Sequence, residues 1–180
     1  FNYAVEIGEV KENICRFTKP ERNNVEKRMD TVRPFKKSEF LTLTKILIRL
    51  TKLIPSIKTA GLALLLIAYT GRRKEEILTL KWSQIKMNNT EMHFSAAQTK
   101  NNKAFIAELL PAASAVLKRL EKERKPSSNH KDQYLFPATT KSKLPYLKNP
   151  IKTWKLAIGL AKKKNPEIEY KCIHMLRHTF

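Results

Sequence analysis

The sequence predicts a mainly helical α+β domain with a small three-stranded antiparallel sheet inserted among the helices. Apolar residues recur at helical spacing in several segments, and three short strand-like segments follow one another between residues 85 and 109, separated by turn residues. A chain of 180 residues with 42% apolar residues is long enough for one such domain and a short appendage.

The first part of the chain differs in composition from the rest. Residues 3–14 place apolar side chains at mixed helical spacing, which indicates a short amphipathic helix. Residues 18–34 are polar, with prolines near both ends of the stretch, and this composition is typical of a linker. We therefore predict a helix within residues 1–17, a linker over 18–34 and the main domain over 35–180.

Two helices are predicted to open the main domain. Ser38 is a favourable N-cap for the first helix, which we expect to be interrupted at Pro55. The second helix is apolar on nearly every side from Leu62 to Ala68, so it should lie buried at the centre of the domain. Gly71 then supplies a left-handed residue that ends it. The apolar face of the first helix comprises Phe40, Leu43, Leu47, Leu50 and Ile54.

Three short strands are predicted next, after a turn or short helix over residues 72–80. Two turns separate the strands, one at Asn88 and Asn89 and the other at residues 99–102. Antiparallel pairing follows because both connections are short. The strands are expected at residues 85–87, 91–95 and 104–109.

Three more helices are expected after the sheet. The first follows Pro111, and a polar loop over residues 125–133 separates it from the next. The last helix begins near Cys172. The apolar face of the first comprises Ala112, Ala113, Val116, Leu117 and Leu120, and that of the second comprises Ile151, Trp154, Ala157, Ile158 and Ala161.

The net charge indicates the class of partner. Lys and Arg number 36 against 16 Asp and Glu, so the formal charge is +20. Such a field attracts polyanions, which makes nucleic acid the leading partner and an anionic membrane surface the second. No basic amphipathic helix with an aromatic face stands out, and the longest apolar run, Ala60 to Tyr69, is too short to span a bilayer. We expect double-stranded DNA and no membrane.

The basic residues gather in one segment in particular. Residues 141–165 hold eight lysines and no acidic residue. A run of charge is usually only a solvated face, but lysines without a compensating carboxylate favour a surface that faces phosphates. The lysines that we expect to contact the DNA backbone are Lys141, Lys143, Lys148, Lys152 and Lys155.

No pattern in the sequence indicates a metal site. Cys15 and Cys172 lie far apart and are best interpreted as free thiols in a reducing cytoplasm. His93 and His130 are isolated, and the carboxylates do not form the spaced set that a two-metal nuclease needs. We expect no metal, no cofactor and no small-molecule substrate.

Two motifs carry the functional signal. Residues 70–76 read TGRRKEE and are followed by LKW at 80–82, and residues 174–180 read HMLRHTF. They resemble the motifs Thr-Gly-x-Arg-x-x-Glu, Leu-x-Trp and His-x-Leu-Arg-His-Thr-Phe of the tyrosine recombinases of the phage integrase family. The resemblance covers about residues 38–180 and implies an integrase-like DNA breaking-rejoining core. It also implies that residues 1–17 are the last helix of a preceding DNA-clamping domain.

Attack on a DNA phosphate builds negative charge on the non-bridging oxygens, so catalysis needs fixed cationic donors around it. Arginine suits this role because its fork pairs bidentately with phosphate and stays charged. The resemblance implies that Arg73 and Arg177 clamp the phosphate and that His174 helps to move the proton of the nucleophile. Glu76 would support the turn that bears Arg73. Taken alone, Arg73 reads equally well as an exposed arginine at a helix start, and only the second motif turns His174 from a core histidine into a candidate.

Lys100 is the next candidate. The family carries a lysine in the turn between its second and third strands, where it protonates the departing 5′-hydroxyl, and this implies the same role for Lys100. Leaving-group protonation typically contributes about 10²- to 10⁴-fold to a rate. A lysine in a turn is commonly just solvated, and Lys103 is a rival in the same turn.

The nucleophile of the family is a tyrosine that follows the second motif. The tyrosines of this chain all precede Arg177, and none has the family context: Tyr3, Tyr69, Tyr134, Tyr146 and Tyr170. The chain begins with Phe1 and stops at Phe180 inside an expected helix, so we interpret it as an incomplete catalytic domain. We expect it to bind DNA without cleaving it.

The resemblance implies that the parent protein is a site-specific recombinase that acts through a 3′-phosphotyrosyl intermediate, without a cofactor. A tetramer on DNA and a bacterial cytoplasmic location at the nucleoid are expected for it. The alternatives are a naturally truncated, non-catalytic DNA-binding remnant and a basic helical module without phosphoryl chemistry. Type IB topoisomerases share this set of catalytic residues, but the sequences of the motifs are more similar to those of the integrases.

Overall fold

The computed structural model describes residues 33–86, 88–124, 134–138 and 143–179. Contacts divide the chain between Arg33 and Pro34, and the described helices and strands all lie in the second unit. The predicted helix within 1–17 and nearly all of the predicted linker lie outside the described residues, as do Cys15, His130, Lys141 and the loop over 125–133. The predicted domain boundaries therefore stay predictions.

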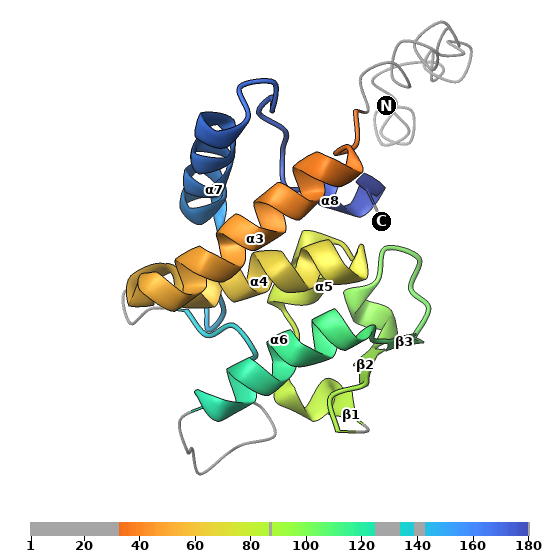
Figure 1. Cartoon of the computed structure of the whole chain (residues 1–180). Helices are drawn as coiled ribbons and strands as arrows, with labels where there is room; N and C mark the ends of the chain where they lie inside the picture. Colours follow the sequence, from red (N-terminus) through yellow and green to blue (C-terminus); the bar gives the residue numbers. More distant parts are fainter. Residues whose placement is uncertain (1–32, 87, 125–133, 139–142, 180) are drawn as a thin grey trace, which may run out of the picture. The chain divides into compact units, whose positions relative to one another are not determined.

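One apolar helix lies at the centre of the domain. Helix α4 (Lys58–Thr70) packs against α3 (Lys37–Leu53), α5 (Lys74–Leu78), α6 (Pro111–Lys122), α7 (Ile151–Lys164) and α8 (Met175–Thr179) (Figure 1). Every residue from Gly61 to Ala68 is buried. Because a helix that is apolar all round must be covered on all sides, the prediction of a central buried helix is confirmed.

Helix α3 buries Leu43, Leu47 and Leu50, as its apolar periodicity predicts. Its predicted start at Ser38 is wrong, because the helix begins at Lys37 and Ser38 lies inside its first turn. The backbone N–H of Lys36 donates to Oε2 of Glu39 at 2.7 Å, so a carboxylate three residues along satisfies the donor. A short 3₁₀ turn, η2 (Pro55–Ile57), follows the helix at the predicted interruption.

Helices α3 and α4 approach each other closely at one point. A Cβ atom on Gly61 would collide with the methyl group of Thr51. Thr51 also receives a long-range contact, since Nη1 of Arg119 donates to its hydroxyl at 2.8 Å and Nη2 to its carbonyl oxygen at 2.7 Å. A glycine at position 61 therefore allows the α3–α4 packing that Arg119 of α6 then holds.

Helix α4 ends at Gly71, as predicted. Gly71 adopts the left-handed conformation with φ of 60°, and its N–H donates to the carbonyl oxygen of Ile67 at 3.0 Å. The chain then turns through Arg72 into the short helix α5 and the 3₁₀ turn η3 (Trp82–Gln84). This tight reversal places residues 71–73 at one end of the central helix.

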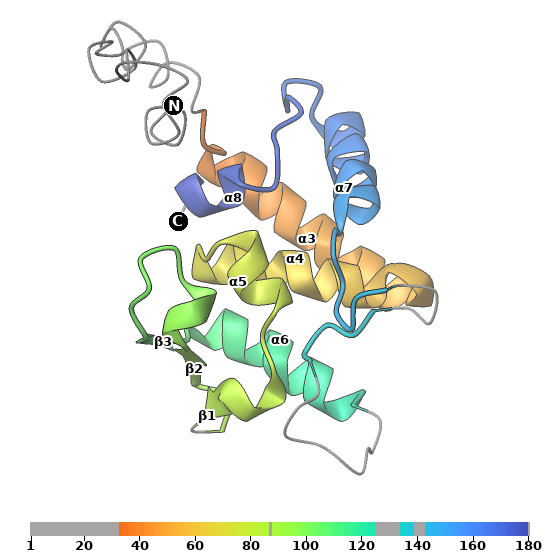
Figure 2. The same cartoon turned by 180° about the vertical axis from the view of Figure 1, so that it is seen from behind.

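The sheet has three antiparallel strands in the order β1 (Ile85–Lys86), β2 (Glu91–Phe94) and β3 (Phe105–Glu108). Met92 pairs with Ile85 on one side and with Ala107 on the other. Asn88 and Asn89 take positive φ values of 53° and 68° in the first turn. The predicted sheet is confirmed, with shorter strands than the sequence indicates. Figure 2 shows it beside α5 and α6.

The helices predicted after the sheet are present as α6, α7 and α8. On α6 the predicted face is buried except for Ala112, which is exposed, while Ser114 is buried and donates to the carbonyl oxygen of Asn89 at 2.6 Å. Trp154 of α7 is fully buried and stacks edge-on against Phe35 with ring centroids 5.9 Å apart. Among the described residues, no helix is long and apolar enough to cross a membrane.

Candidate active site

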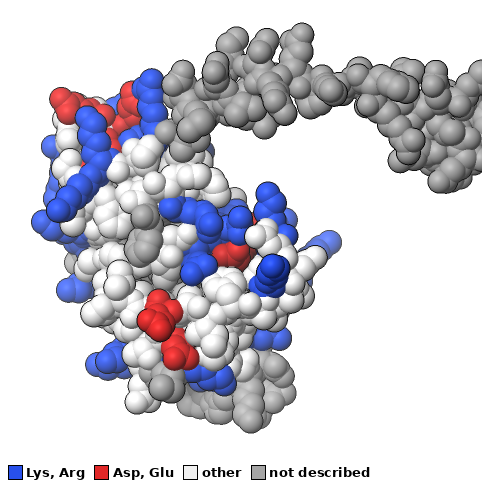
Figure 3. Space-filling view, turned by 90° about the vertical axis from the view of Figure 1, so that its right-hand side faces the viewer, with Lys and Arg blue, Asp and Glu red and all other residues white. Residues whose placement is uncertain are grey.

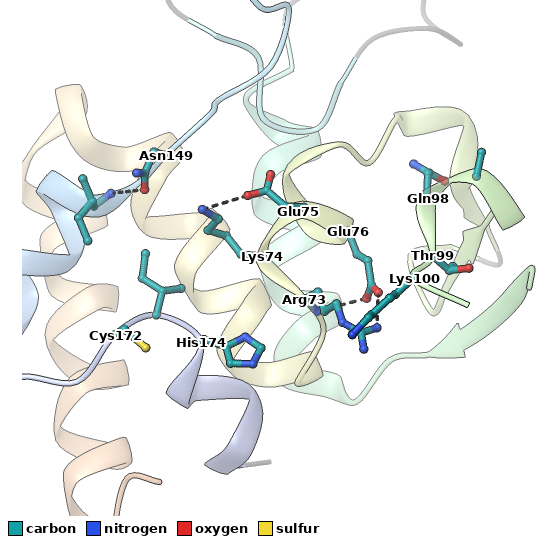
Figure 4. A pocket seen from close by; sticks show the side chains of 13 residues that line it. Arg73, Lys74, Glu75, Glu76, Gln98, Thr99, Lys100, Asn149, Cys172 and His174 are labelled. Atoms are coloured by element: carbon teal, nitrogen blue, oxygen red, sulfur yellow. Dashed lines mark hydrogen bonds and ion pairs between the residues drawn. The ribbon is translucent and has the colours of Figure 1, made fainter. Parts of the chain in front are cut away.

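A pocket of about 700 Å³ gathers residues from four segments of the chain (Figure 4). Its walls come from the start of α5, the connection between β2 and β3, the start of α7 and the residues just before α8. Arg73, Lys100 and His174 all line it, although they lie far apart in the sequence. The structure thus brings together three of the side chains that the motifs single out.

Arg73 is held by a buried carboxylate. The N–H of Arg73 donates to Oε2 of Glu76 at 3.2 Å, and its Nη1 donates to Oε1 at 3.1 Å. The Glu76 side chain is 4% exposed, whereas that of Arg73 is 39% exposed. The Glu76 carboxylate therefore holds both the backbone N–H and the guanidinium of Arg73, while the guanidinium stays accessible at the pocket. This is the geometry that a supporting role for Glu76 requires.

Arg177 reaches the loop that carries Arg73. Its Nη1 donates to the carbonyl oxygen of Gly71 at 3.2 Å. It projects from α8, which packs against α4. Arg177 is not among the residues that line the pocket, so it stands beside the Arg73 loop and not in the pocket wall. Its predicted contact with the same phosphate as Arg73 stays a prediction.

His174 directly precedes α8, and its carbonyl oxygen accepts the N–H of Arg177 at 3.1 Å. Burial lowers the pKa of His174 below its ordinary value of 6.5, and the positive charges of His178, Arg177 and Arg73 lower it further. Both predicted phosphate clamps therefore lie within electrostatic reach of this imidazole. Because the charged form is disfavoured, the ring is neutral at neutral pH and can accept a proton.

His178 lies beside His174, and their rings meet edge-on with centroids 4.9 Å apart. His178 is exposed. The contact described for it is with the ring of His174, so its position bears on the candidate site. Its charge is one of the causes that lower the pKa of His174.

Lys100 lies in the connection between β2 and β3, as expected. The hydroxyl of Thr99 accepts the N–H of Lys103 at 3.1 Å and donates to its carbonyl oxygen at 2.9 Å, which closes the turn around Lys100. Asn102 takes a positive φ of 49° there. Both lysines are exposed, but Lys100 lines the pocket and Lys103 does not. The geometry favours Lys100 over its rival.

The lysines predicted to face DNA are exposed wherever the structure describes them. Lys152 and Lys155 lie on α7, whose first residue, Ile151, lines the pocket. Lys143 and Lys148 lie in the segment before it. Figure 3 shows a group of Lys and Arg side chains in the middle of one face of the domain. The exposed positions of the four described lysines suit contact with a polyanion, and the contacts themselves stay predictions.

Several residues at the site were not singled out from the sequence. Lys74, Gln98 and Asn149 line the pocket, as does Cys172, which is a free and exposed thiol as expected. Arg72 stacks on an aromatic ring of β3. Lys74 and Arg72 are neighbours of Arg73 in the sequence, and this adjacency is the signal that could have identified them. No sequence pattern marks Gln98 or Asn149, which the fold brings to the pocket.

The described tyrosines lie elsewhere. No tyrosine is among the described residues that line the pocket. Tyr134 and Tyr146 pack together with ring centroids 5.2 Å apart. Burial raises the pKa of Tyr69 above its ordinary value of 10.0, against a hydrogen bond with Thr44. A partly buried phenol of raised pKa is less readily ionised and is therefore a poor nucleophile.

Among the described residues, no group of three His, Cys, Asp or Glu side chains could hold a metal ion. His93 is paired with Glu91 at 2.9 Å, which gives this histidine an ordinary surface role. What the site offers is three cations, two arginines and a lysine, together with a neutral imidazole and one buried carboxylate. Such a set can bind and polarise an anion.

Solved structures of tyrosine recombinases share this fold. The XerH site-specific recombinase bound to palindromic difH substrate, in a post-cleavage complex, matches 82% of this chain with a TM-score of 0.59 at 22% identity. The Tn1549 transposon integrase in complex with circular intermediate DNA matches 82% with a TM-score of 0.57 at 16% identity. A second complex of that integrase matches 100% with a TM-score of 0.59 at 13% identity. The chain spans 40%, 50% and 61% of those three chains.

The domain therefore has the fold of a tyrosine recombinase catalytic domain. No curated sequence matches the chain. The sequence profile of the phage integrase family matches residues 35–180, and the chain belongs to that family.

Proposed function

We propose that this chain supplies the phosphate-binding part of a site-specific DNA recombinase that acts through a 3′-phosphotyrosyl intermediate. The observation that supports the proposal most is the pocket that unites Arg73, Lys100 and His174, with Arg177 bonded to the loop of Arg73. Membership of the phage integrase family and the DNA complexes among the structural relatives are consistent with it.

The proposed reaction is an in-line transfer of a DNA phosphoryl group. The oxygen of a tyrosine attacks phosphorus, a phosphorus–oxygen bond forms, and the bond from phosphorus to the 5′-oxygen breaks. The neutral imidazole of His174 takes up the phenolic proton, and the ammonium of Lys100 gives a proton to the departing 5′-oxygen. Arg73 and Arg177 offset the charge that develops on the non-bridging oxygens. The covalent link retains the phosphodiester energy, so no cofactor is required.

We propose that a tyrosine outside this chain supplies the attacking hydroxyl, because no tyrosine among the described residues lines the pocket. The chain by itself would then bind duplex DNA without cleaving it. The same observation favours a second candidate, a non-catalytic DNA-binding protein that keeps the phosphate site of its relatives. A tetramer on DNA and a location at the bacterial nucleoid belong to the first candidate.

The test uses the full-length gene product and a pool of random-sequence duplexes. We expect a protein–DNA adduct that survives denaturation and that carries a tyrosine joined to a 3′-phosphate, as identified by mass spectrometry. Arg73→Ala should abolish the adduct, while Lys118→Ala, an exposed change on α6, should not. Tight binding without any adduct would favour the non-catalytic candidate, and an adduct on a 5′-phosphate would overturn the proposed chemistry.

A further inference from the structure

Arg72 and Arg73 are consecutive, yet their guanidinium groups have different partners. Arg73 pairs with Glu76. The guanidinium carbon of Arg72 lies 4.3 Å from the centroid of the Phe105 ring, at the start of β3. The motif resemblance leaves position 72 variable, so the contact is a property of this chain.

The ring under Arg72 is part of a stack. Phe105 lies parallel to Phe94, with centroids 4.7 Å apart and an interplanar angle of 14°. The two residues are paired across β2 and β3, at the ends of the strands where residues 95–104 leave the sheet and return to it. The stack is therefore the base of the connection that carries Lys100, and Arg72 covers it.

The connection has ties of its own on the other side. The amide of Gln84 donates to Oε1 of Gln98 at 2.6 Å, which fixes the 3₁₀ turn η4 (Ala96–Gln98) to the η3 segment. The hydroxyl of Thr99 closes the turn at Lys103. Neither tie reaches residues 71–73. The contact of Arg72 with Phe105 joins the base of the connection to the loop that carries Arg73.

The surroundings of Arg72 explain why an aromatic face suits it. Burial lowers the pKa of Arg72 below its ordinary value; the charge of Glu76 opposes this shift, and Arg177 lowers the pKa further. Arginine nevertheless stays charged in proteins. Glu76 is already bonded to Arg73, so the negative face of an aromatic ring attracts this further cation without a second carboxylate.

We propose that Arg72 is a positioning residue for Lys100, which it holds over the pocket by clamping Phe105 at the base of the connection. The inference rests on the proposed role of Lys100 in phosphoryl transfer. In this scheme Arg72 acts through Phe105 and does not touch the phosphate. Its loss should loosen residues 95–104 while Arg73 and Glu76 keep their contact.

The first test measures the mobility of the connection in the absence of DNA. A nitroxide label on Asn101→Cys, with Cys15→Ser and Cys172→Ser as background, reports it by electron paramagnetic resonance. We expect Arg72→Met to mobilise the label, Arg72→Lys to restore part of the order, and Phe105→Leu to act like Arg72→Met. The double variant should add nothing to either single change.

Arg49→Met is the control, because Arg49 is exposed on α3 and is not part of the connection or of the segments tied to it. It should leave the label unchanged, and melting curves verify that each variant is folded. An unchanged spectrum in folded Arg72→Met would overturn the proposal. An equal change in Arg49→Met would do so too, because it would show a general loosening of the domain.

The second test measures cleavage by the full-length gene product on two substrates. One carries the normal 5′-oxygen and the other a bridging 5′-sulfur, whose thiolate leaves without a proton. Arg72→Met should cleave the 5′-oxygen substrate about tenfold more slowly or worse, as partial loss of general-acid catalysis predicts. It should cleave the 5′-sulfur substrate at a near-normal rate, because that leaving group needs no proton. Lys100→Ala should show the same pattern more strongly, with DNA affinity unchanged in Arg72→Met.

An equal loss on both substrates would overturn the proposal, because it would make Arg72 a phosphate contact. Absence of cleavage by the unchanged protein on either substrate would instead overturn the proposed function and, with it, the catalytic meaning of the Lys100 position. The spin-label result separates the two failures, because it reports whether Arg72 holds the connection whatever the protein does to DNA.

Discussion

Arg177 and Gly71 are bonded across 106 residues of sequence: Nη1 of the arginine donates to the glycine carbonyl oxygen at 3.2 Å. Gly71 ends α4 and stands two residues before Arg73. The bond therefore joins the helix of the second motif to the loop of the first. It uses one of the five N–H donors of the Arg177 fork.

Removal of the Arg177 fork should weaken this junction. Arg177→Met keeps much of the apolar stem but leaves the Gly71 carbonyl without its donor, so we expect the free energy of unfolding to fall by about 1 kcal/mol. Urea denaturation measures it. Arg49→Met, an exposed change on α3, is the control and should have a smaller effect. Equal stability of the two variants would mean that the bond to Gly71 contributes nothing.

The supporting role of the Glu76 carboxylate can be tested by comparing Glu76→Gln with the same change at the adjacent Glu75. Glu76→Gln keeps the shape and one acceptor, but it removes the charge that holds Arg73, so we expect a loss of about 1–3 kcal/mol in the free energy of unfolding. DNA affinity should fall as well. Glu75→Gln changes a side chain that is 65% exposed and pairs with Lys74 at 3.0 Å. It should cost no more than about 0.5 kcal/mol, and a similar loss in both variants would contradict the supporting role of Glu76.

A buried ion pair at the start of α3 gives a pH-dependent prediction. Nζ of Lys171 lies 2.8 Å from Oε2 of Glu39, and both side chains are mostly buried, 11% and 8% exposed. Burial alone would raise the pKa of Glu39, but hydrogen bonds from Lys171 and the Lys36 N–H bring it below the ordinary 4.5. A depressed carboxyl pKa adds stability above the unfolded value, and that stability is lost as the pH falls through the folded value.

We therefore expect the unfolding free energy to decline between about pH 5 and pH 3, and the decline to be smaller in Glu39→Gln. Lys171→Met should cost about 3–5 kcal/mol at neutral pH, because it leaves a buried carboxylate unpaired. Urea denaturation across this pH range, with the exposed change Glu167→Gln as control, measures both effects. The same acid decline in Glu39→Gln and in the unchanged protein would contradict the assignment.

The same pair shows why the start of α3 was not predictable. The general preference for serine at helix N-caps favoured Ser38. In the structure the backbone N–H of Lys36 donates to Glu39, which is oriented by Lys171 from 132 residues away. The burial of α4 and its end at Gly71 were predictable, because they follow from composition and from one residue's backbone freedom. Local sequence decides the burial and the end of α4, whereas a long-range contact decides the start of α3.

The candidate site divides in the same way. Arg73 and His174 could be found from motif spacing, and the structure places both at one pocket. The resemblance pointed to Lys100, with Lys103 as its rival, and the structure adds that Lys100 lines the pocket whereas Lys103 does not. The stacking of Arg72 pairs two residues from different elements without any local pattern, so it needed the fold.

His174 should titrate below its ordinary pKa of 6.5. Burial disfavours the imidazolium first, and the positive neighbours His178, Arg177 and Arg73 disfavour it further. Arg73→Met removes one positive charge, so the pKa should rise, and a bound phosphate anion should raise it in the unchanged protein. An NMR titration of the ring protons measures these shifts. A His174 pKa that does not respond to Arg73→Met would contradict the electrostatic link between the two motifs.

The lysine-rich surface should make DNA binding depend steeply on salt. Each phosphate contact contributes a slope of about −0.9 to a plot of log affinity against log salt concentration, because each contact releases condensed counterions. Lys148→Ala, Lys152→Ala and Lys155→Ala should each make the slope shallower by about that amount wherever the side chain meets a phosphate. Fluorescence anisotropy with a labelled duplex measures the slope. Lys118→Ala on α6 should leave it unchanged, and a nearly flat response in the unchanged protein would remove DNA as the partner of this surface.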